Sequence, residues 1–176
     1  PSFIVPGAFV IAADGGLEKL REDGITPDLV MGDFDSLGEN PTGDNVLTFP
    51  KEKDDTDTML AIKEALRRGY EKIYISGAVG GRLDHTVANI QSLIFAVKLG
   101  AEAYLCGGEE TVTVINYGSV KFREKPSGRI SVFCLSDSAT AVNISGLKYQ
   151  AVGASLSNMF PIGVSNEFIG GEASVS

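Results

Sequence analysis

Two aspartates that follow a short apolar run are the residues of this sequence best suited to chemistry. The run Leu29 to Met31 ends in Gly32, and Asp33 and Asp35 come next. Two residues apart on an extended chain, their side chains point the same way. Adjacent ionised carboxylates repel unless a cation lies between them, and exposed hard oxygen ligands suit Mg²⁺ bound with substrate phosphates. The alternative for an isolated Asp-x-Asp is a polar turn after a strand.

A second acidic cluster stands before a helix. The apolar spacing predicts this helix over residues 56–68, and Asp54, Asp55 and Asp57 lie at its start. Acidic residues cap a helix and suit its dipole, but one or two are enough for that purpose. Asp54 and Asp57 are three positions apart and share one side of the first turn, so the surplus of carboxylates indicates a functional site.

A glycine-rich turn supplies the positive counterpart of these carboxylates. Residues 77–81 contain three glycines, and Arg82 stands just before a helix predicted over residues 84–99. Such a turn offers free backbone N–H groups, and the arginine fork binds phosphate oxygens. His85, in the first turn of this helix, is more typical of a surface or capping side chain than of a catalyst.

The elements that position these residues alternate between strand and helix in the first part of the chain. Strands are predicted over 9–13, 29–32, 72–76 and 101–106, and helices over 17–22, 56–68 and 84–99. This alternation indicates an α/β domain with a mostly parallel sheet, in which Asp14 and the glycines after it follow the first strand. Short alternating segments then follow, over 111–116, 120–123, 130–135, 139–144, 154–160 and 168–175. They predict an antiparallel sandwich or barrel, with a domain boundary at residues 108 and 109.

Composition limits the class of partner. The 176 residues include 43% apolar residues and carry a formal charge of −8, which argues against nucleic acid or an anionic membrane as a partner. Neither a signal peptide nor a membrane-spanning run is expected. Cys106 and Cys134 lack the spacing of metal ligands and are expected to be reduced core residues, which favours a cytoplasmic protein.

Taken together, five motifs in this order resemble the thiamine pyrophosphokinase family over nearly the whole chain. They are Ala-Asp-Gly-Gly at 13–16, the acidic strand end at 27–36, Asp-Asp-Thr-Asp at 54–57, Gly-Gly-Arg-Leu-Asp-His at 80–85 and Phe-Pro-Ile-Gly-Val-Ser-Asn-Glu at 160–167. The resemblance implies a Rossmann-like α/β domain over 1–108 that binds ATP, and an antiparallel β-sandwich over 109–176 that binds thiamine and forms a homodimer. It implies Mg²⁺-dependent transfer of the pyrophosphoryl group of ATP to the thiamine hydroxyl, with AMP as the second product. Thiamine is expected between one subunit's nucleotide domain and the other's sandwich.

The resemblance also implies roles for individual residues. Asp33, Asp35 and Asp57 match the metal-binding positions and, with Arg82, act in catalysis. Ser165 and Asn166 match the loop associated with thiamine. The positions that match ATP or phosphate contacts are Asp14, Gly15, Asp54, Thr56, Gly80, Gly81, Arg82 and Asp84. Either Asp57 or Asp84 would orient or deprotonate the attacking hydroxyl.

Two other functions compete with this one. A phosphohydrolase of the haloacid dehalogenase type also places Asp-x-Asp after an apolar strand, but its later Gly-Asp motif has no clear match after residue 36. A nucleotide-binding regulator would need a metal site but not so many carboxylates at strand ends. A trapped aspartyl-phosphate at Asp33 would favour the first, and ATP binding without AMP production the second.

Overall fold

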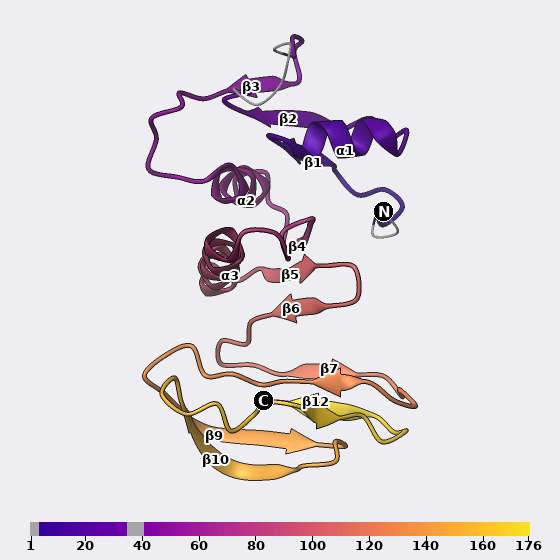
Figure 1. Cartoon of the computed structure of the whole chain (residues 1–176), viewed down its shortest axis with the longest axis vertical. Helices are drawn as coiled ribbons and strands as arrows, with labels where there is room; N and C mark the ends of the chain where they lie inside the picture. The colour runs from indigo at the N-terminus through magenta and orange to yellow at the C-terminus, as the bar shows by residue number, and fades with distance from the viewer. Residues whose placement is uncertain (1–3, 35–40) are drawn as a thin grey trace. The chain divides into compact units, whose positions relative to one another are not determined.

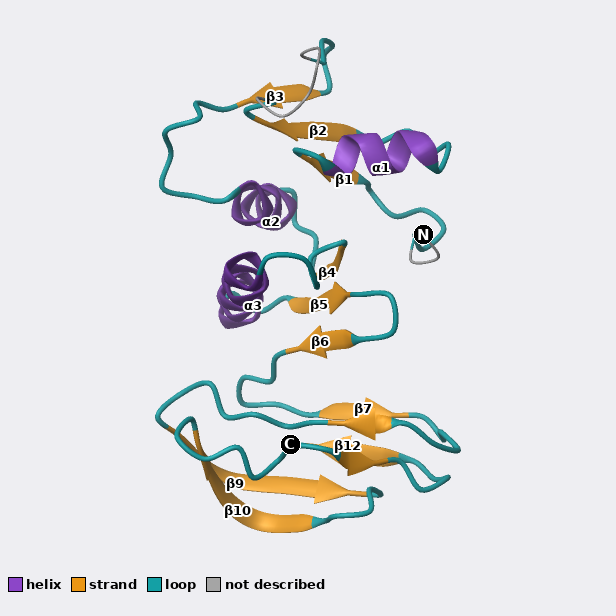
Figure 2. Cartoon of the chain, viewed as in Figure 1, coloured by secondary structure: helices purple, strands orange, loops and turns teal. Residues whose placement is uncertain are grey.

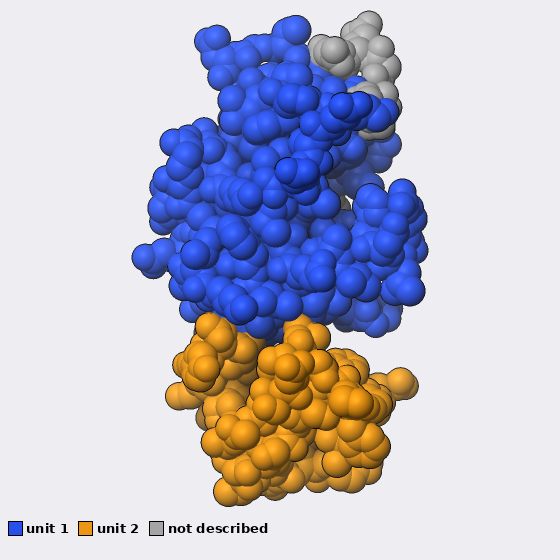
Figure 3. Space-filling view, turned by 90° about the vertical axis from the view of Figure 1, so that its left-hand side faces the viewer, with its two compact units in different colours: residues 1–114 blue, residues 115–176 orange. Residues whose placement is uncertain are grey.

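The computed structural model describes residues 4–34 and 41–176, which divide into two compact units. The first unit ends at Val114 and the second runs from Ile115 to Ser176 (Figure 3). The division lies a few residues after the expected position, because residues 111–113 pair with a strand of the first unit.

The first unit begins with a parallel sheet. Its strands are β1 (Ile11–Ala13), β2 (Leu29–Gly32) and β3 (Val46–Thr48), hydrogen-bonded in the order β1-β2-β3. The helix α1 (Gly16–Glu22) follows β1 directly (Figure 1). All four residues of β2 are buried, which explains its unbroken apolar sequence, since strands of parallel sheets are covered on both faces.

A second sheet in this unit mixes the two strand directions. The strands β4 (Lys72–Ser76) and β5 (Glu102–Cys106) are parallel, and β6 (Thr111–Thr113) pairs antiparallel with β5. The helix α3 (Leu83–Lys98) connects β4 to β5, and α2 (Asp57–Arg67) lies beside α3 (Figure 2). The expected mixture of helices and mostly parallel strands is therefore present in this unit.

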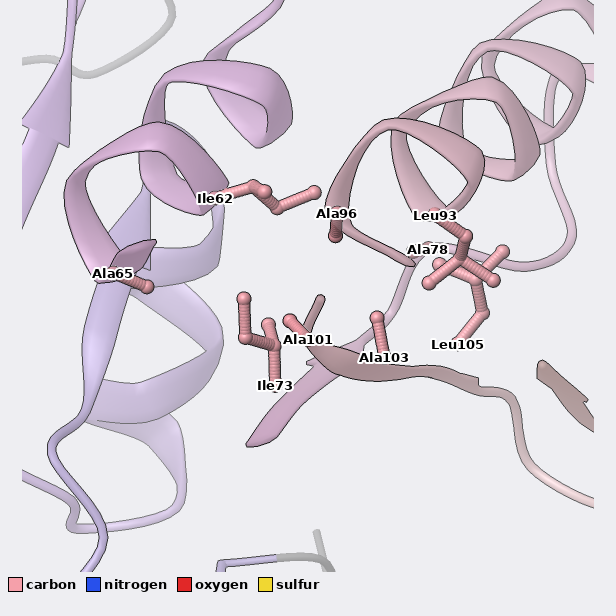
Figure 4. Close-up of a cluster of buried hydrophobic side chains, with 9 residues drawn as sticks. All are labelled: Ile62, Ala65, Ile73, Ala78, Leu93, Ala96, Ala101, Ala103 and Leu105. Atoms are coloured by element: carbon pink, nitrogen blue, oxygen red, sulfur yellow. The ribbon is translucent and has the colours of Figure 1, made fainter. Parts of the chain in front are cut away.

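The core of the first unit lies between α2, α3 and the second sheet (Figure 4). Helix α2 contributes Ile62 and Ala65, and α3 contributes Leu93 and Ala96, at the three-residue spacing that places side chains on one helix face. Residues of the sheet and its flanks complete the cluster: Ile73, Ala78, Ala101, Ala103 and Leu105. Ile11 of β1 packs against the same cluster, whereas Ala12, Leu17, Val30 and Phe34 form a separate cluster at the first sheet.

A buried carboxylate fixes the end of α2. Glu64 accepts hydrogen bonds from Nε and Nη2 of Arg67 and from Nε of Arg68, each at 2.7 Å. These hydrogen bonds, with that of Arg67 first, outweigh the effect of burial and lower the pKa of Glu64 from 4.5 to about 2. The guanidinium of Arg68 also lies 4.7 Å from the centre of the Phe9 ring. The helix is therefore tied to the segment before β1.

The second unit is built from short strands without a helix among its described residues. Its elements are β7 (Val120–Phe122), β8 (Arg129–Ile130), β9 (Ser138–Ser145), β10 (Ala151–Ser157), β11 (Asn166–Glu167) and β12 (Ala173–Val175). Four of them form an antiparallel sheet in the order β10-β9-β12-β7, and β11 pairs with β8. Val142, Ile144, Leu147, Phe168, Ala173 and Val175 form its separate core.

Several predicted elements agree with the structure and others differ. The strand predicted over 130–135 forms only at its start, in β8, and that over 168–175 only at its end, in β12. The strands at 29–32 and 72–76 have the expected bounds, and the three helices lie within one or two residues of theirs. The strand β3 was not expected, and β6 belongs to the first unit rather than to the all-β part. In the described part of the chain, none of the helices combines the length and the apolar character that crossing a membrane requires.

We expect Glu64→Gln to change how the stability of the first unit depends on pH. The folded pKa of Glu64 lies below its unfolded value, so the carboxylate stabilises the fold fully above about pH 4.5 and loses this effect as the pH falls toward about 2. The difference in unfolding free energy between the wild type and the variant should therefore be largest near neutral pH and shrink in acid. Urea unfolding of both proteins over this pH range measures it, and a constant difference would contradict the low pKa.

Candidate functional site

Two aspartates leave neighbouring parallel strands at one edge of the first sheet. Ala13 pairs with Met31, so β1 and β2 end side by side, and Asp14 and Asp33 follow them. The backbone N–H of Asp14 donates to the Met31 carbonyl at 2.8 Å, and Asp14 has a φ of 45°. The structure thus brings two of the predicted site residues to the carboxyl end of this sheet, where ligands bind in open α/β sheets.

The turn after β2 is held by close packing around Gly32. A Cβ at this position would lie 3.2 Å from the Cα of Asp14 and 3.3 Å from Cε1 of Phe34. Phe34 itself is only 1% exposed and has a φ of 58°, which is rare for a bulky residue and is tolerated only where the surroundings enforce it. The buried ring therefore fixes the direction in which the chain carries Asp33.

The ammonium of Lys53 lies between two carboxylates. Its Nζ is 3.3 Å from Oδ2 of Asp33 and 2.9 Å from Oδ1 of Asp57, and all three side chains are at most 25% exposed. Burial alone would lower the pKa of Lys53, but the attraction of Asp57 and Asp33 outweighs it and raises the pKa above 10.5. This contact joins the end of β2 to the beginning of α2.

The acidic cluster before α2 separates into three different environments. Thr56 caps the helix, since its Oγ1 accepts a hydrogen bond from the N–H of Met59 at 3.2 Å, and Asp57 is the first helical residue. Asp55 pairs with Lys63 at 2.7 Å, away from the contact with Lys53. Asp54 is exposed. Among the predicted residues at this helix start, Asp57 is the one whose side chain contacts Lys53, which also pairs with Asp33.

The donor set fits a hard divalent cation. Oδ1 of Asp57 is buried, and the partner that the structure describes for it is the ammonium of Lys53 at 2.9 Å. A buried carboxylate oxygen that faces a positive charge is suited to a cation. Two carboxylates suit Mg²⁺ better than a softer metal. Asp35 lies outside the described residues, and within 4–34 and 41–176 no three His, Cys, Asp or Glu side chains form a cluster that could hold a metal. Two of the three predicted ligands are thus brought together around one position.

The glycine-rich turn between β4 and α3 is anchored to the helix. The side-chain amide of Asn89, a buried residue of α3, donates to the carbonyl of Ala78 at 2.9 Å. Gly77, Gly80 and Gly81 all have positive φ, so the turn depends on glycine. Nζ of Lys19, on α1, lies 3.6 Å from where a Cβ on Gly77 would stand, which brings a second positive charge to this turn.

Arg82 and Asp84 bind each other in this structure. Nε of Arg82 donates to Oδ1 of Asp84 at 3.1 Å, and Nη2 donates to the other carboxylate oxygen. Their side chains are 73% and 63% exposed, and the hydrogen bond with Arg82 lowers the pKa of Asp84 below its usual 3.8. A pair this exposed is weak, so the arginine fork is available to an anionic ligand.

In the second unit, the two residues predicted to contact thiamine differ in exposure. Ser165 is exposed and has a φ of 61°, and its backbone N–H donates to Oγ of Ser131 at 3.1 Å. Asn166 is 5% exposed, and its amide group exchanges two hydrogen bonds with the backbone of Tyr149, at 2.9 and 2.6 Å. The Asn166 side chain therefore supports the loop, while that of Ser165 faces outward.

Sequence reasoning did not identify Lys53, Lys19 or Asn89. A signal existed for Lys53, which stands four residues before Asp57 and directly before the acidic segment 54–57. Asn89 and Lys19 gave no such signal. Polar residues are common in helices, and the sequence does not show which groups they contact.

Comparisons with known proteins agree along the chain. Residues 4–105 match the family model described as thiamin pyrophosphokinase, catalytic domain, and residues 119–176 match the thiamin pyrophosphokinase, vitamin B1 binding domain. The sequence is 30% identical to the thiamine pyrophosphokinase of Bacillus subtilis over 166 residues, which cover 90% of this chain and 78% of that protein.

Solved structures show the same similarity. The crystal structure of the Bacillus subtilis thiamine pyrophosphokinase superposes with a TM-score of 0.84 at 27% identity, covering 94% of this chain and 81% of that one. A thiamin pyrophosphokinase family protein from Enterococcus faecalis gives a TM-score of 0.81 at 30% identity, covering 94% and 82%.

We expect Gly32→Ala to destabilise the first unit by about 1–3 kcal/mol, because the added methyl group meets the Asp14 backbone and the Phe34 ring. Urea unfolding measures the change. Gly108→Ala is the matched control in the same unit, since a Cβ there meets nothing within 4 Å, and it should have little effect. Equal losses in the two variants would contradict the packing described around Gly32.

Proposed function

Since this chain belongs to the thiamin pyrophosphokinase family, we propose that Asp33, Asp57 and the glycine-rich turn bind Mg²⁺ and the triphosphate of ATP, and that the second unit binds thiamine. The observation that carries the proposal is the convergence of Asp33 and Asp57 on one cation position. Phosphate chemistry at an acidic protein needs such a position, because the chain itself is negatively charged.

The chain is a transferase that moves the pyrophosphoryl group of ATP to the hydroxyl of thiamine. The hydroxyl oxygen forms a bond to the β-phosphorus and loses its proton, while the bond from that phosphorus to the oxygen bridging the α-phosphate breaks. AMP leaves with the bridging oxygen, and thiamine diphosphate is the other product. Family membership sets aside the phosphohydrolase and the nucleotide-binding regulator as alternatives.

Positioning and charge neutralisation are what such a transfer requires from the protein. We propose Asp33, Asp35 and Asp57 as the residues that hold Mg²⁺, which supplies positive charge to the phosphate oxygens when it is bound. The buried Oδ1 of Asp57, which already faces a positive charge at 2.9 Å, supports this assignment.

Around the phosphates we propose a second group of contacts. The turn before α3 offers the backbone N–H groups of Gly80 and Gly81 and the guanidinium of Arg82. A phosphate that took the place of the Asp84 carboxylate would accept the same hydrogen bonds from Arg82. Asp14, Gly15, Asp54 and Thr56 remain proposed contacts of the nucleotide. The approach of Lys19 to Gly77 supports a phosphate position near this turn.

For the second unit we propose thiamine binding and dimerisation. The outward-facing Ser165, with its left-handed backbone, is the favoured contact, and Asn166 shapes the loop from inside. We also propose, from the family resemblance, that the first unit is a Rossmann-like nucleotide domain and the second a β-sandwich, with the boundary after Val114. The free cysteines Cys106 and Cys134 are consistent with a cytoplasmic location.

A homodimer is part of the proposal. Phe133, Phe160 and Ile162 line one hollow of the second unit and are 56%, 65% and 66% exposed in the single chain. Large apolar side chains grouped in this way mark protein interfaces, and a second copy of the chain is the partner that the family resemblance implies.

Purified protein given ATP, Mg²⁺ and thiamine should form AMP and thiamine diphosphate in equal amounts, and Asp57→Asn should lower this turnover about 10²-fold or more. The loss is expected because the variant removes negative charge from the cation position. Chromatography of nucleotides and thiamine esters measures both products.

Asp55→Asn is the matched control for this experiment. Asp55 belongs to the same acidic segment but pairs with Lys63, so its replacement should leave turnover close to the wild-type value. ADP or phosphate formed without thiamine would contradict the proposed chemistry, and wild-type turnover in a folded Asp57→Asn protein would contradict the proposed site.

The dimer proposal predicts that Phe160→Asp converts the protein to a monomer, because a buried charge in the interface has no partner. Light scattering after size-exclusion chromatography gives the mass, to be compared with 18.6 kDa for one chain. Tyr117→Asp, at a fully exposed residue outside the hollow, should leave the dimer intact. A monomeric wild type, or a dimeric Phe160→Asp protein, would refute the assignment of this face.

A further inference from the structure

Lys53 occupies the position that a cation would need. Its Nζ is within 3.3 Å of Asp33 and 2.9 Å of Asp57, and the side chain is only 14% exposed. The two carboxylates come from different elements, the end of β2 and the start of α2, and this ammonium is what joins them. The ammonium therefore reduces the repulsion between the two carboxylates.

An ammonium and a divalent cation cannot both occupy this place. Carboxylate oxygens lie about 2.1 Å from Mg²⁺, closer than they lie to Nζ here, so a metal bound by both residues would stand where the ammonium stands. The Lys53 side chain has a flexible four-carbon stem, which allows the ammonium to leave while the backbone stays in place.

We propose that Lys53 is the internal counter-ion of the acidic site, that a divalent cation displaces it, and that the displaced ammonium then binds the phosphate oxygens of the nucleotide. The proposal rests on the proposed function for its last step. Lysine is suited to this exchange because it binds carboxylate and phosphate alike as a compact point charge. The enzyme would thus keep its carboxylates together before the metal arrives and gain a phosphate ligand afterwards.

A simpler role is that Lys53 only ties α2 to β2. The two roles predict opposite results when the charge is removed. A structural tie would weaken metal binding when it is lost, because Asp33 and Asp57 would no longer be held together. A displaced counter-ion would strengthen metal binding, because the competitor for the same oxygens is gone.

The experiment compares Mn²⁺ binding to the full chain without nucleotide in the wild type and in Lys53→Met, which keeps a similar length without the charge. Electron paramagnetic resonance measures free Mn²⁺, and turnover to AMP is measured on the same proteins with Mg²⁺. We expect Lys53→Met to bind Mn²⁺ about tenfold more tightly and to turn over about 10²-fold more slowly. Lys63→Met, which removes a similar ion pair outside the site, should change neither value by more than about twofold.

Each result decides one part of the proposal. Unchanged or weaker Mn²⁺ binding in Lys53→Met would overturn the role as counter-ion, and tighter binding with wild-type turnover would overturn the step to the phosphates. If Lys53→Met does not fold, Lys53→Gln is measured in the same way, with circular dichroism as the test of folding. A wild type that binds Mn²⁺ but forms no AMP would contradict the proposed function and still leave the comparison of Mn²⁺ affinities decisive for Lys53.

Discussion

Repulsion between carboxylates gathered in one place is the constraint on which the first unit depends. Parallel strands deliver Asp14 and Asp33 to the same sheet edge, and Lys53 links Asp33 to Asp57 at the start of α2. Two like charges about 4 Å apart at an effective dielectric constant of about 20 interact by about 4 kcal/mol, a large part of the 5–15 kcal/mol that stabilises a typical domain. Lys53, whose ammonium lies 3.3 Å from Asp33 and 2.9 Å from Asp57, supplies positive charge that offsets such repulsion.

This requirement explains why the scaffold around the site is so closely packed. The left-handed Phe34, with its buried ring, and the glycine beneath it leave the chain little freedom after β2. Thr56 fixes the first turn of α2, which carries Asp57, by accepting a hydrogen bond from the N–H of Met59. Ordered elements thus hold the carboxylates, and the ammonium between them is carried on a long side chain with several rotatable bonds.

The sequence predicted those features that depend on local pattern. The bounds of β2 and β4 followed from short apolar runs, and α2 followed from its three- and four-residue apolar spacing. The strand β3 has only Val46, Leu47 and Thr48 between turn residues and becomes a strand through its pairing with β2. The pairing of β6 with β5 is likewise a non-local contact that no window of sequence contains. In the site, residue type alone indicated the acidic residues, whereas Lys53 and Asn89 acquired meaning only from the groups that their side chains reach.

The hydrogen bond from Asn89 to Ala78 has a consequence for the cost of binding. A turn of several glycines samples many conformations, and closing it on a ligand would cost entropy at the moment of association. Because a buried amide of α3 already holds the middle of this turn, much of that cost is met when the protein folds. The turn is then ordered before any ligand arrives, and its order comes from the body of a sixteen-residue helix.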